Sequence, residues 1–252
     1  MISETSPLKN LILRPFSGTL IRIMNTEHQK KIAAEKATES VHSGMIVGLG
    51  TGSTVYYALL ELGRMVRDGL DIVGIPTSDG TEQVALEQKI PLTTLAMHPT
   101  IDLTIDGADE VDAHLNLIKG GGAALVREKI IANASKKILI VVDENKISRV
   151  LGTNFPLPVE IVRFGWEATQ TEVNRICGSS TLRVAFTQDR KENPLITDNG
   201  NYILDCHFDG IPTPTEVELQ LNNIPGVVEN GIFVNRADKI IIGTPSGIRY
   251  ME

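Results

Sequence analysis

The chain has 252 residues, of which 42% are hydrophobic and 22% charged, an ordinary composition for a globular protein. Its net charge of −7 disfavours non-specific nucleic-acid binding, which needs clustered lysines and arginines. An acidic chain can still hold a phosphorylated small molecule, because a few local lysines and backbone amides suffice. No apolar run approaches the length of about 18 residues that a transmembrane helix needs. We therefore expect neither a nucleic-acid nor a membrane partner.

Cysteine and histidine spacing indicates neither a metal site nor a disulfide framework. The two cysteines, Cys177 and Cys206, form no CxxC pair, and the five histidines form no HxxxH or HExxH pattern. So few cysteines fit a reducing compartment. We expect a cytoplasmic protein that needs no metal or other cofactor.

Residues 1–23 differ from the rest of the chain. Prolines and a glycine interrupt scattered leucines and isoleucines, and no apolar core precedes a small-residue cleavage site. We expect an N-terminal extension without ordered structure, since terminal segments are commonly disordered. Its basic residues outnumber Glu4, which leaves a targeting segment open as the alternative.

Short apolar strands alternate with amphipathic helices from residue 24 to about residue 150. The run at 45–49 ends in glycines and has the uninterrupted hydrophobicity of a buried parallel strand. We predict strands at 45–49, 71–75, 101–105 and 137–142, and helices at 27–42, 53–62, 81–88 and 123–134. This alternation is typical of an open, doubly wound (Rossmann-like) parallel sheet.

The order of the predicted elements changes after Leu151. We predict strands at 158–162, 182–186, 202–208 and 232–234, and helices at 166–176 and 216–221. The resulting order, β-α-β-β-α-β, is that of a ferredoxin-like α+β arrangement. The final apolar run, 239–243, is expected to return to the first sheet. We therefore predict a Rossmann-like catalytic domain of residues 24–153 and 236–252, and a small α+β domain of residues 154–235.

The first stretch suited to chemistry is GTGST, residues 50–54, between a predicted strand and a predicted helix. Glycines let backbone approach a ligand closely, and the free amides of a helix start attract an anion. The hydroxyls of Thr51, Ser53 and Thr54 add donors. The stretch is neither a P-loop nor a complete dinucleotide fingerprint, since Val55 replaces the third glycine. It predicts a phosphate cradle, or else a tight turn capped by Ser53.

Two further stretches combine glycines with charged side chains. DGADE, residues 106–110, follows a predicted strand at the sheet edge where ligands bind in open α/β folds. KGGG, residues 119–122, precedes a predicted helix that carries Glu128. Three consecutive glycines are costly in backbone entropy, so we expect their backbone to approach a ligand. Taken alone, DGAD could be a solvated turn and Glu128 a surface acid paired with a lysine.

Together these motifs resemble one family. GTGST, DGADE, KGGGAALVREK and PLPVE occur in the order found in A-type ribose-5-phosphate isomerases. The later stretches TDNGNYILD, IPGVVENGIF and IIGTPSG are similar to the same family, so the resemblance covers about residues 27–247. KGGGAALVREK with DGADE upstream is highly specific, whereas GTGST alone is weak.

The resemblance implies a role for each motif. Glu128 matches the family's general base, Asp106 and Asp109 match residues of the sugar site, and Lys30 and Lys146 are similar to lysines near the phosphate. The candidate catalytic residues are Glu128, Asp106, Asp109 and Lys119. The candidate substrate-binding residues are Thr51, Gly52, Ser53, Thr54, Asp106, Gly107, Ala108, Asp109, Lys119, Gly120, Gly121, Gly122, Lys146 and Lys30.

The implied activity is the interconversion of D-ribose 5-phosphate and D-ribulose 5-phosphate, in the non-oxidative branch of the pentose phosphate pathway, by a homodimer or homotetramer. A carboxylate would carry the proton between C2 and C1 through an enediolate. Lys119 and the Gly120–Gly122 amides would stabilise the oxyanion. Asp106, with Lys119 or Asp109 assisting, would open the sugar ring. The alternatives are a sugar-phosphate-binding sensor and an acyl or CoA transferase with Glu128 as nucleophile.

Overall fold

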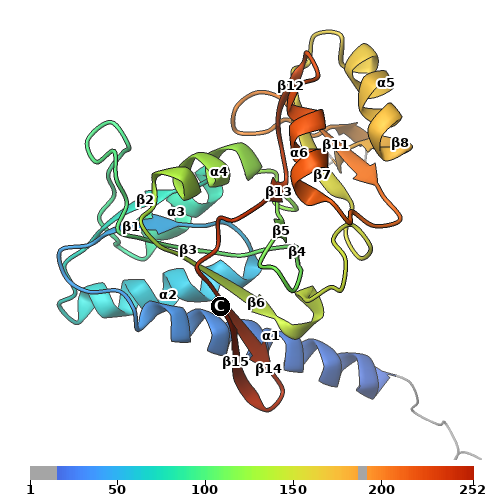
Figure 1. The fold of residues 1–252 in the computed structure, drawn as a ribbon. Coiled ribbons are helices and arrows are strands. Elements are labelled where there is room, and N and C mark those ends of the chain that lie inside the picture. Colours follow the sequence, from blue (N-terminus) through green and yellow to red (C-terminus); the bar gives the residue numbers. More distant parts are fainter. Residues whose placement is uncertain (1–15, 187–191) are drawn as a thin grey trace, which may run out of the picture.

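A six-stranded sheet lies at the centre of the larger part of the molecule (Figure 1). The computed structural model describes residues 16–186 and 192–252. The strand order is β15-β14-β6-β3-β1-β2, and every neighbouring pair except β14 and β15 is parallel. The strands are β1 (Ile46–Leu49), β2 (Val73–Pro76), β3 (Leu103–Asp106), β6 (Ile138–Asp143), β14 (Lys239–Thr244) and β15 (Gly247–Met251). The predicted return of residues 239–243 to this sheet is confirmed, since β14 pairs with β6.

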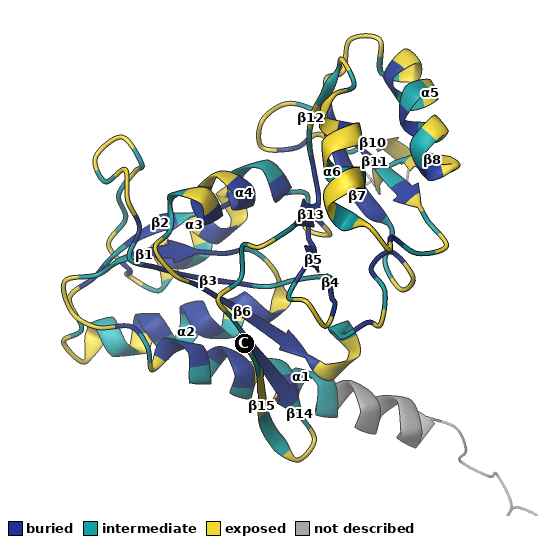
Figure 2. Ribbon diagram, viewed as in Figure 1, coloured by how far each residue is buried: buried dark blue, intermediate teal, exposed yellow. Residues whose placement is uncertain are grey.

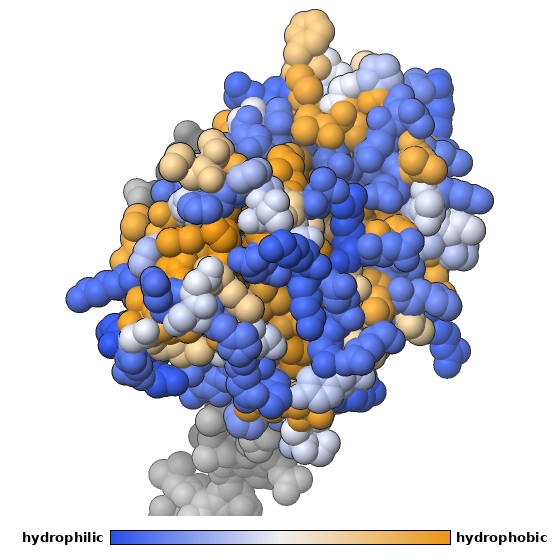
Figure 3. All heavy atoms as spheres, turned by 60° about the vertical axis from the view of Figure 1, so that its left-hand side comes forward, coloured by the Kyte–Doolittle hydropathy of each residue, from blue (hydrophilic) through white to orange (hydrophobic). Residues whose placement is uncertain are grey.

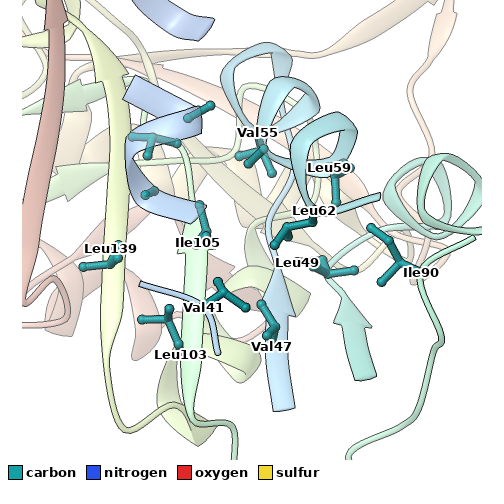
Figure 4. Close-up of a cluster of buried hydrophobic side chains, with 14 of the residues drawn as sticks. Val41, Val47, Leu49, Val55, Leu59, Leu62, Ile90, Leu103, Ile105 and Leu139 are labelled. Carbon is teal, nitrogen blue, oxygen red and sulfur yellow. The ribbon is translucent and has the colours of Figure 1, made fainter. Parts of the chain in front are cut away.

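Helices cover both faces of this sheet because its strands are apolar on both sides. Val47 and Leu49 of β1 pack with α1 (Phe16–Thr38), α2 (Ser53–Arg67) and α3 (Asp79–Glu87) in the cluster of Figure 4. Ile46 belongs to a separate cluster with Ile131 of α4 (Leu125–Ala134). Side chains alternate between the faces of a strand, so α4 lies on the face opposite α1 and α2. This is the predicted doubly wound arrangement.

A four-stranded antiparallel sheet forms the second part of the fold (Figure 1). Its order is β12-β7-β11-β8. The elements are β7 (Leu157–Ile161), α5 (Trp166–Cys177), β8 (Ser179–Leu182), β11 (Tyr202–His207), α6 (Pro214–Asn222) and β12 (Val227–Asn230). In chain order, β7 is the first strand, β8 the second, β11 the third and β12 the fourth. The order across the sheet is therefore 4-1-3-2, that of a ferredoxin-like sheet. The predicted fold class is confirmed, and the predicted domain boundaries stay a prediction.

Two predicted strands lie outside the sheet to which the sequence assigned them. Residues 184–186 form β9 (Val184–Phe186), which pairs only with β10 (Glu192–Pro194) among the described residues. Residues 232–233 form β13 (Ile232–Phe233), which pairs with β5 (Leu117–Ile118), itself paired with β4 (Glu110–Val111). The strands that take their places, β8 and β12, are largely polar or half exposed (Figure 2). Their partners, not their own hydrophobicity, make them strands.

The first helix begins earlier than the sequence pattern indicates. We predict a start at Glu27, but α1 runs from Phe16, directly after Pro15, so residues 16–23 of the predicted extension belong to a helix. Extending a formed helix costs far less than nucleating one, which explains the added turns. The expectation for residues 1–15 lies outside the described residues.

Candidate active site

The three motifs meet where β1 and β3 end. The strand order places β2 on one side of β1 and β3 on the other, so the chain leaves these neighbouring strands in opposite directions. Ligands bind at such a switch point in open α/β sheets. GTGST follows β1 and leads into α2, while DGADE begins at the last residue of β3. KGGG follows β5 and leads towards α4, which carries Glu128.

Lys119 is the buried centre of this site. Its ammonium Nζ lies 3.1 Å from Asp106 Oδ1 and 3.1 Å from Glu128 Oε1. It also donates a hydrogen bond of 2.5 Å to the carbonyl oxygen of Gly107. All three charged side chains are almost wholly buried, where an ion pair is weakly screened by water. One cation therefore holds two carboxylates that the fold brings together from a strand and a helix.

Burial changes the proton affinity of all three groups. Burial raises the pKa of Glu128, and the nearby Lys119 ammonium lowers it. The effect of burial is the larger, so the pKa moves from 4.5 to about 8. Burial likewise raises the pKa of Asp106, against the pull of Lys119. For Lys119 burial lowers the pKa, but attraction to Asp106 and Glu128 outweighs burial, so the pKa rises above its usual range. Lys119 therefore stays charged, and Glu128 is a stronger base than an exposed glutamate.

One oxygen of Glu128 is left without a partner. Oε1 accepts from Lys119, whereas Oε2 is buried and has no hydrogen-bond partner among the described residues. Such an atom is costly to bury unless a ligand or a proton occupies it. Glu128 also lines a small cleft, so this oxygen is available to a bound molecule. The other lining residues are Thr51, Gly52, Ser53, Thr54, Gly107, Ala108, Asp109, Lys119, Gly120, Gly122 and Lys146.

The DGAD and KGGG loops are tied together by Asp109. Its Oδ2 accepts a hydrogen bond of 2.7 Å from the amide of Gly121. A side chain at position 121 would place its Cβ 2.6 Å from Asp109 Oδ1, and Gly120 has a φ of +101°. Both positions therefore need glycine, one for close approach and one for its backbone conformation. Gly121 and Asp106 are not among the residues that line the cleft.

The GTGST loop starts α2 without a side-chain cap. Gly52 is the N-cap, and within residues 16–186 and 192–252 no side-chain cap accepts from the first amides, so the Ser53 side chain does not cap this helix. Free helix-start amides beside the hydroxyls of Ser53 and Thr54 suit an anion. The Thr51 hydroxyl instead lies 2.7 Å from Thr77 Oγ1 and 2.8 Å from Ser78 Oγ. Thr51 therefore helps to fix the loop through its side chain.

The two candidate phosphate lysines differ in position. Lys146, in the short 3-10 helix η1 (Glu144–Lys146) after β6, lines the cleft. Lys30 on α1 does not line it, and its ammonium pairs with Glu27 Oε1 at 2.7 Å.

Two residues outside the three loop motifs also contact the site. Phe233 of β13 lies under the Lys119 ammonium, 5.7 Å from ring centroid to Nζ. Arg183, between β8 and β9, donates to the carbonyl oxygens of Gly120 and Gly121 at 2.7 and 3.3 Å. Both come from segments more than 50 residues away in sequence from the loops that they contact. Only the folded chain brings them there.

A second groove, beside α4, is mainly apolar. Its lining residues include Leu92, Leu95 and Ile130. On the face shown in Figure 3, hydrophilic side chains predominate and hydrophobic ones form small groups between them. Across residues 16–186 and 192–252, no helix has the length and apolar character to span a bilayer. Within the same ranges, no three His, Cys, Asp or Glu side chains gather as metal ligands.

Comparison with known proteins identifies the family of the chain. Residues 73–247 match the family model of ribose 5-phosphate isomerase A (phosphoriboisomerase A). The ribose-5-phosphate isomerase A of Thermococcus kodakarensis is 45% identical over 231 residues, covering 91% of this chain and 100% of that protein. Ribose-5-phosphate isomerase A 1 of Oceanobacillus iheyensis is 49% identical over 220 residues, covering 87% of this chain and 96% of that protein.

Solved structures give the same result. A D-ribose-5-phosphate isomerase in complex with phospho-erythronic acid superposes with a TM-score of 0.85 at 43% identity, covering 91% of this chain and 100% of that one. Ribose 5-phosphate isomerase A of Methanocaldococcus jannaschii superposes with a TM-score of 0.83 at 40% identity, covering 88% and 97%. The chain belongs to the ribose 5-phosphate isomerase A family.

Proposed function

We propose that this isomerase interconverts D-ribose 5-phosphate and D-ribulose 5-phosphate with Glu128 as the proton carrier. The observation that carries this assignment is that Glu128 lines the cleft and that its buried Oε2 has no hydrogen-bond partner among the described residues. The raised pKa of Glu128 supports it, because a general base works best with a pKa near the operating pH.

The reaction then proceeds by two proton transfers at carbon. The Glu128 carboxylate takes the proton from C2 of the open-chain aldose, and the electron pair moves to form the enediolate with its negative charge on the C1 oxygen. The Lys119 ammonium stabilises that charge, and the backbone amides of the Gly120–Gly122 loop add to it. The C2 hydroxyl proton passes to the C1 oxygen, Glu128 returns its proton to C1, and the electron pair left on the C2 oxygen forms the carbonyl of the ketose.

Ring opening needs a separate acid–base group. The sequence assigns it to Asp106, with Lys119 or Asp109 assisting. Asp109 lines the cleft, whereas Asp106 does not line it and accepts from Lys119 and from the amides of Thr51 and Gly107. This arrangement favours Asp109 for contact with the sugar and Asp106 for holding Lys119. The phosphate would lie on Ser53, Thr54 and the free amides of α2, with Lys146 nearby.

The bound ligand of one solved relative is consistent with a sugar-phosphate substrate. That isomerase is in complex with phospho-erythronic acid. The acid carries a phosphate at one end and a carboxylate at the other, and its two carboxylate oxygens resemble the two oxygens of an enediolate. A sensor would not need an unpartnered base, and a transferase would need room for a nucleotide, so the site favours an isomerase over both alternatives. The cytoplasmic location and the homodimer or homotetramer stay predictions; two free, buried cysteines fit the former.

A solvent isotope experiment tests the proposed transfer directly. The chain is expected to convert ribose 5-phosphate in deuterated water into ribulose 5-phosphate that carries deuterium at C1, at least in part, because the protonated carboxyl can exchange with solvent before it reprotonates the enediolate. Mass spectrometry and NMR of the product locate the label. A hydride shift would introduce none, so product without deuterium, together with complete transfer of a C2 label to C1, would count against exchange with solvent.

The pH dependence follows from the raised pKa of Glu128. We expect kcat/KM for ribose 5-phosphate to rise with pH and to level off above about 8. Glu128 accepts a proton only as the carboxylate, so below its pKa the active fraction falls about tenfold per pH unit. The substrate phosphate titrates at about pH 6, so the part of the profile between about pH 6 and about pH 8 reports the titration of Glu128. A profile that stays flat down to the ordinary glutamate pKa of 4.5 would contradict the prediction.

A further inference from the structure

Arg183 connects the four-stranded sheet to the glycine loop of the site. It follows β8, and its Nε donates to Oδ2 of Asp205 at 2.9 Å while Nη2 donates to the other carboxylate oxygen. Asp205 belongs to β11, and both side chains are largely buried. A two-pronged pair of this kind fixes the plane of the guanidinium. The third nitrogen is therefore held in a defined direction.

That nitrogen, Nη1, binds the backbone of the loop. It donates to the carbonyl oxygen of Gly120 at 2.7 Å and to that of Gly121 at 3.3 Å. In a trans peptide the carbonyl and the following amide point in opposite directions. Holding these two carbonyls towards Arg183 therefore turns the amides of Gly121 and Gly122 away from it.

Those two amides face the catalytic side of the loop. The Gly121 amide donates to Asp109 Oδ2 at 2.7 Å. Gly122 lines the cleft, and no acceptor for its amide is found among the described residues. Neither of the two residues has a Cβ to limit rotation of their peptide units, so the loop sequence alone does not fix which way the amides point. A rotated peptide would place a carbonyl oxygen where negative charge develops.

We propose that Arg183, held by Asp205, is a positioning residue that aims the Gly122 amide into the site and keeps the Gly121 amide on Asp109. The role rests on the proposed isomerase function, because the aimed Gly122 amide stabilises the oxyanion of the enediolate. It gives the four-stranded sheet a part in catalysis without any contact between Arg183 and substrate.

Three variants and a matched control test this role. Arg183→Gln removes the guanidinium group. Arg183→Lys keeps the positive charge but cannot bind a carboxylate and two carbonyls at once. The double variant Arg183→Gln with Asp205→Asn leaves no unpaired carboxylate. Arg175→Gln removes an exposed pair with Glu172 on α5, remote from the loop, and is the control. Steady-state kinetics with ribose 5-phosphate, affinity for phospho-erythronic acid and the thermal midpoint are measured for each.

Arg183→Gln and the double variant are expected to lose about 10²-fold in kcat, the scale set by misplacing catalytic groups. KM should change by less than about threefold, since the phosphate contacts are untouched. Affinity for phospho-erythronic acid should fall in parallel with kcat, Arg183→Lys should lie between, and the control should match the wild type. Where Arg183→Gln does not fold, Arg183→Lys and the double variant decide.

The proposal is overturned if folded variants keep wild-type kcat, or if KM alone rises. Failure of the proposed function looks different. In that case the wild type itself does not convert ribose 5-phosphate, while the effect of Arg183 on the affinity for phospho-erythronic acid still shows whether it orients the loop.

Discussion

Replacing Glu128 by glutamine is expected to lower kcat for ribose 5-phosphate by about 10² to 10⁴, the usual contribution of general acid–base catalysis. The amide keeps the shape of the side chain but cannot accept the C2 proton. Its oxygen can still accept from Lys119, as Glu128 Oε1 does at 3.1 Å. Binding should therefore change little, because the proposed phosphate contacts lie on Ser53 and Thr54.

Glu82→Gln is the matched control for this variant. Glu82 is an exposed acid in the first turn of α3 and lines the separate apolar groove, so the same substitution there should leave turnover unchanged. Affinity for phospho-erythronic acid, measured by calorimetry, separates binding from chemistry. A Glu128→Gln enzyme with near-normal turnover would remove Glu128 from the role of base and leave the isotope result without its proposed carrier.

The loops of the site are predictable because their signals are local. Glycines between an apolar strand and an amphipathic helix mark a ligand loop, and GTGST, DGAD and KGGG each follow this rule. All the residues that line the cleft come from these motifs, from Glu128 or from Lys146. The resemblance to the family adds the roles, which the residue types alone leave open. Glu128 illustrates this, since a glutamate in the first helical turn is usually a solvated acid.

The supporting contacts are not predictable in the same way. Arg183 reaches the Gly120 carbonyl across 63 positions of sequence, and Phe233 reaches Lys119 through the pairing of β13 with β5. Phe233 ends the stretch IPGVVENGIF, but nothing in that stretch indicates a contact with Lys119, and a lone arginine between two strands is typical of a surface charge. The same limit explains β12, which the sequence placed at 232–234. Strand partners, which depend on the whole fold, decide which of two adjacent apolar runs joins a sheet.

Burial is the property that links these contacts to the chemistry. The sequence gives charges on Asp106, Lys119 and Glu128 but not their common environment, and it is this environment that raises the pKa of Glu128. In water the three groups would titrate independently. In the site one ammonium serves two carboxylates, so any change to Lys119 alters both the proton affinity of Glu128 and the stability of the fold.

Lys119→Met is accordingly expected to have two large effects. Turnover should fall by about 10² to 10³, as for other removed oxyanion donors. Because the ammonium lowers the pKa of Glu128, its loss should also move the rising limb of kcat/KM to higher pH. Thr54→Val is the contrast, since it removes a proposed phosphate donor that acts equally in the ground and transition states and should mainly raise KM. The reverse pattern would mean that the two loops exchange roles.

The second effect of Lys119→Met is on stability. Removing one partner of a buried ion pair costs about 3 to 5 kcal/mol, and here it leaves Asp106 and Glu128 both buried without their cation. Burial raises the pKa of both carboxyls in the folded state, so the folded variant binds more protons than the unfolded chain and gains stability as pH falls through those raised pKa values. Without the ammonium that lowers them, these pKa values lie higher in the variant than in the wild type. The thermal midpoint of the variant, relative to the wild type, should therefore recover as pH falls from above 8 to about 8, where Glu128 of the variant takes up a proton that Glu128 of the wild type does not yet bind. A deficit that does not change over this range would mean that the two carboxylates are not the source of the instability, and that Lys119 stabilises the fold through its contacts with Gly107 and Phe233 instead.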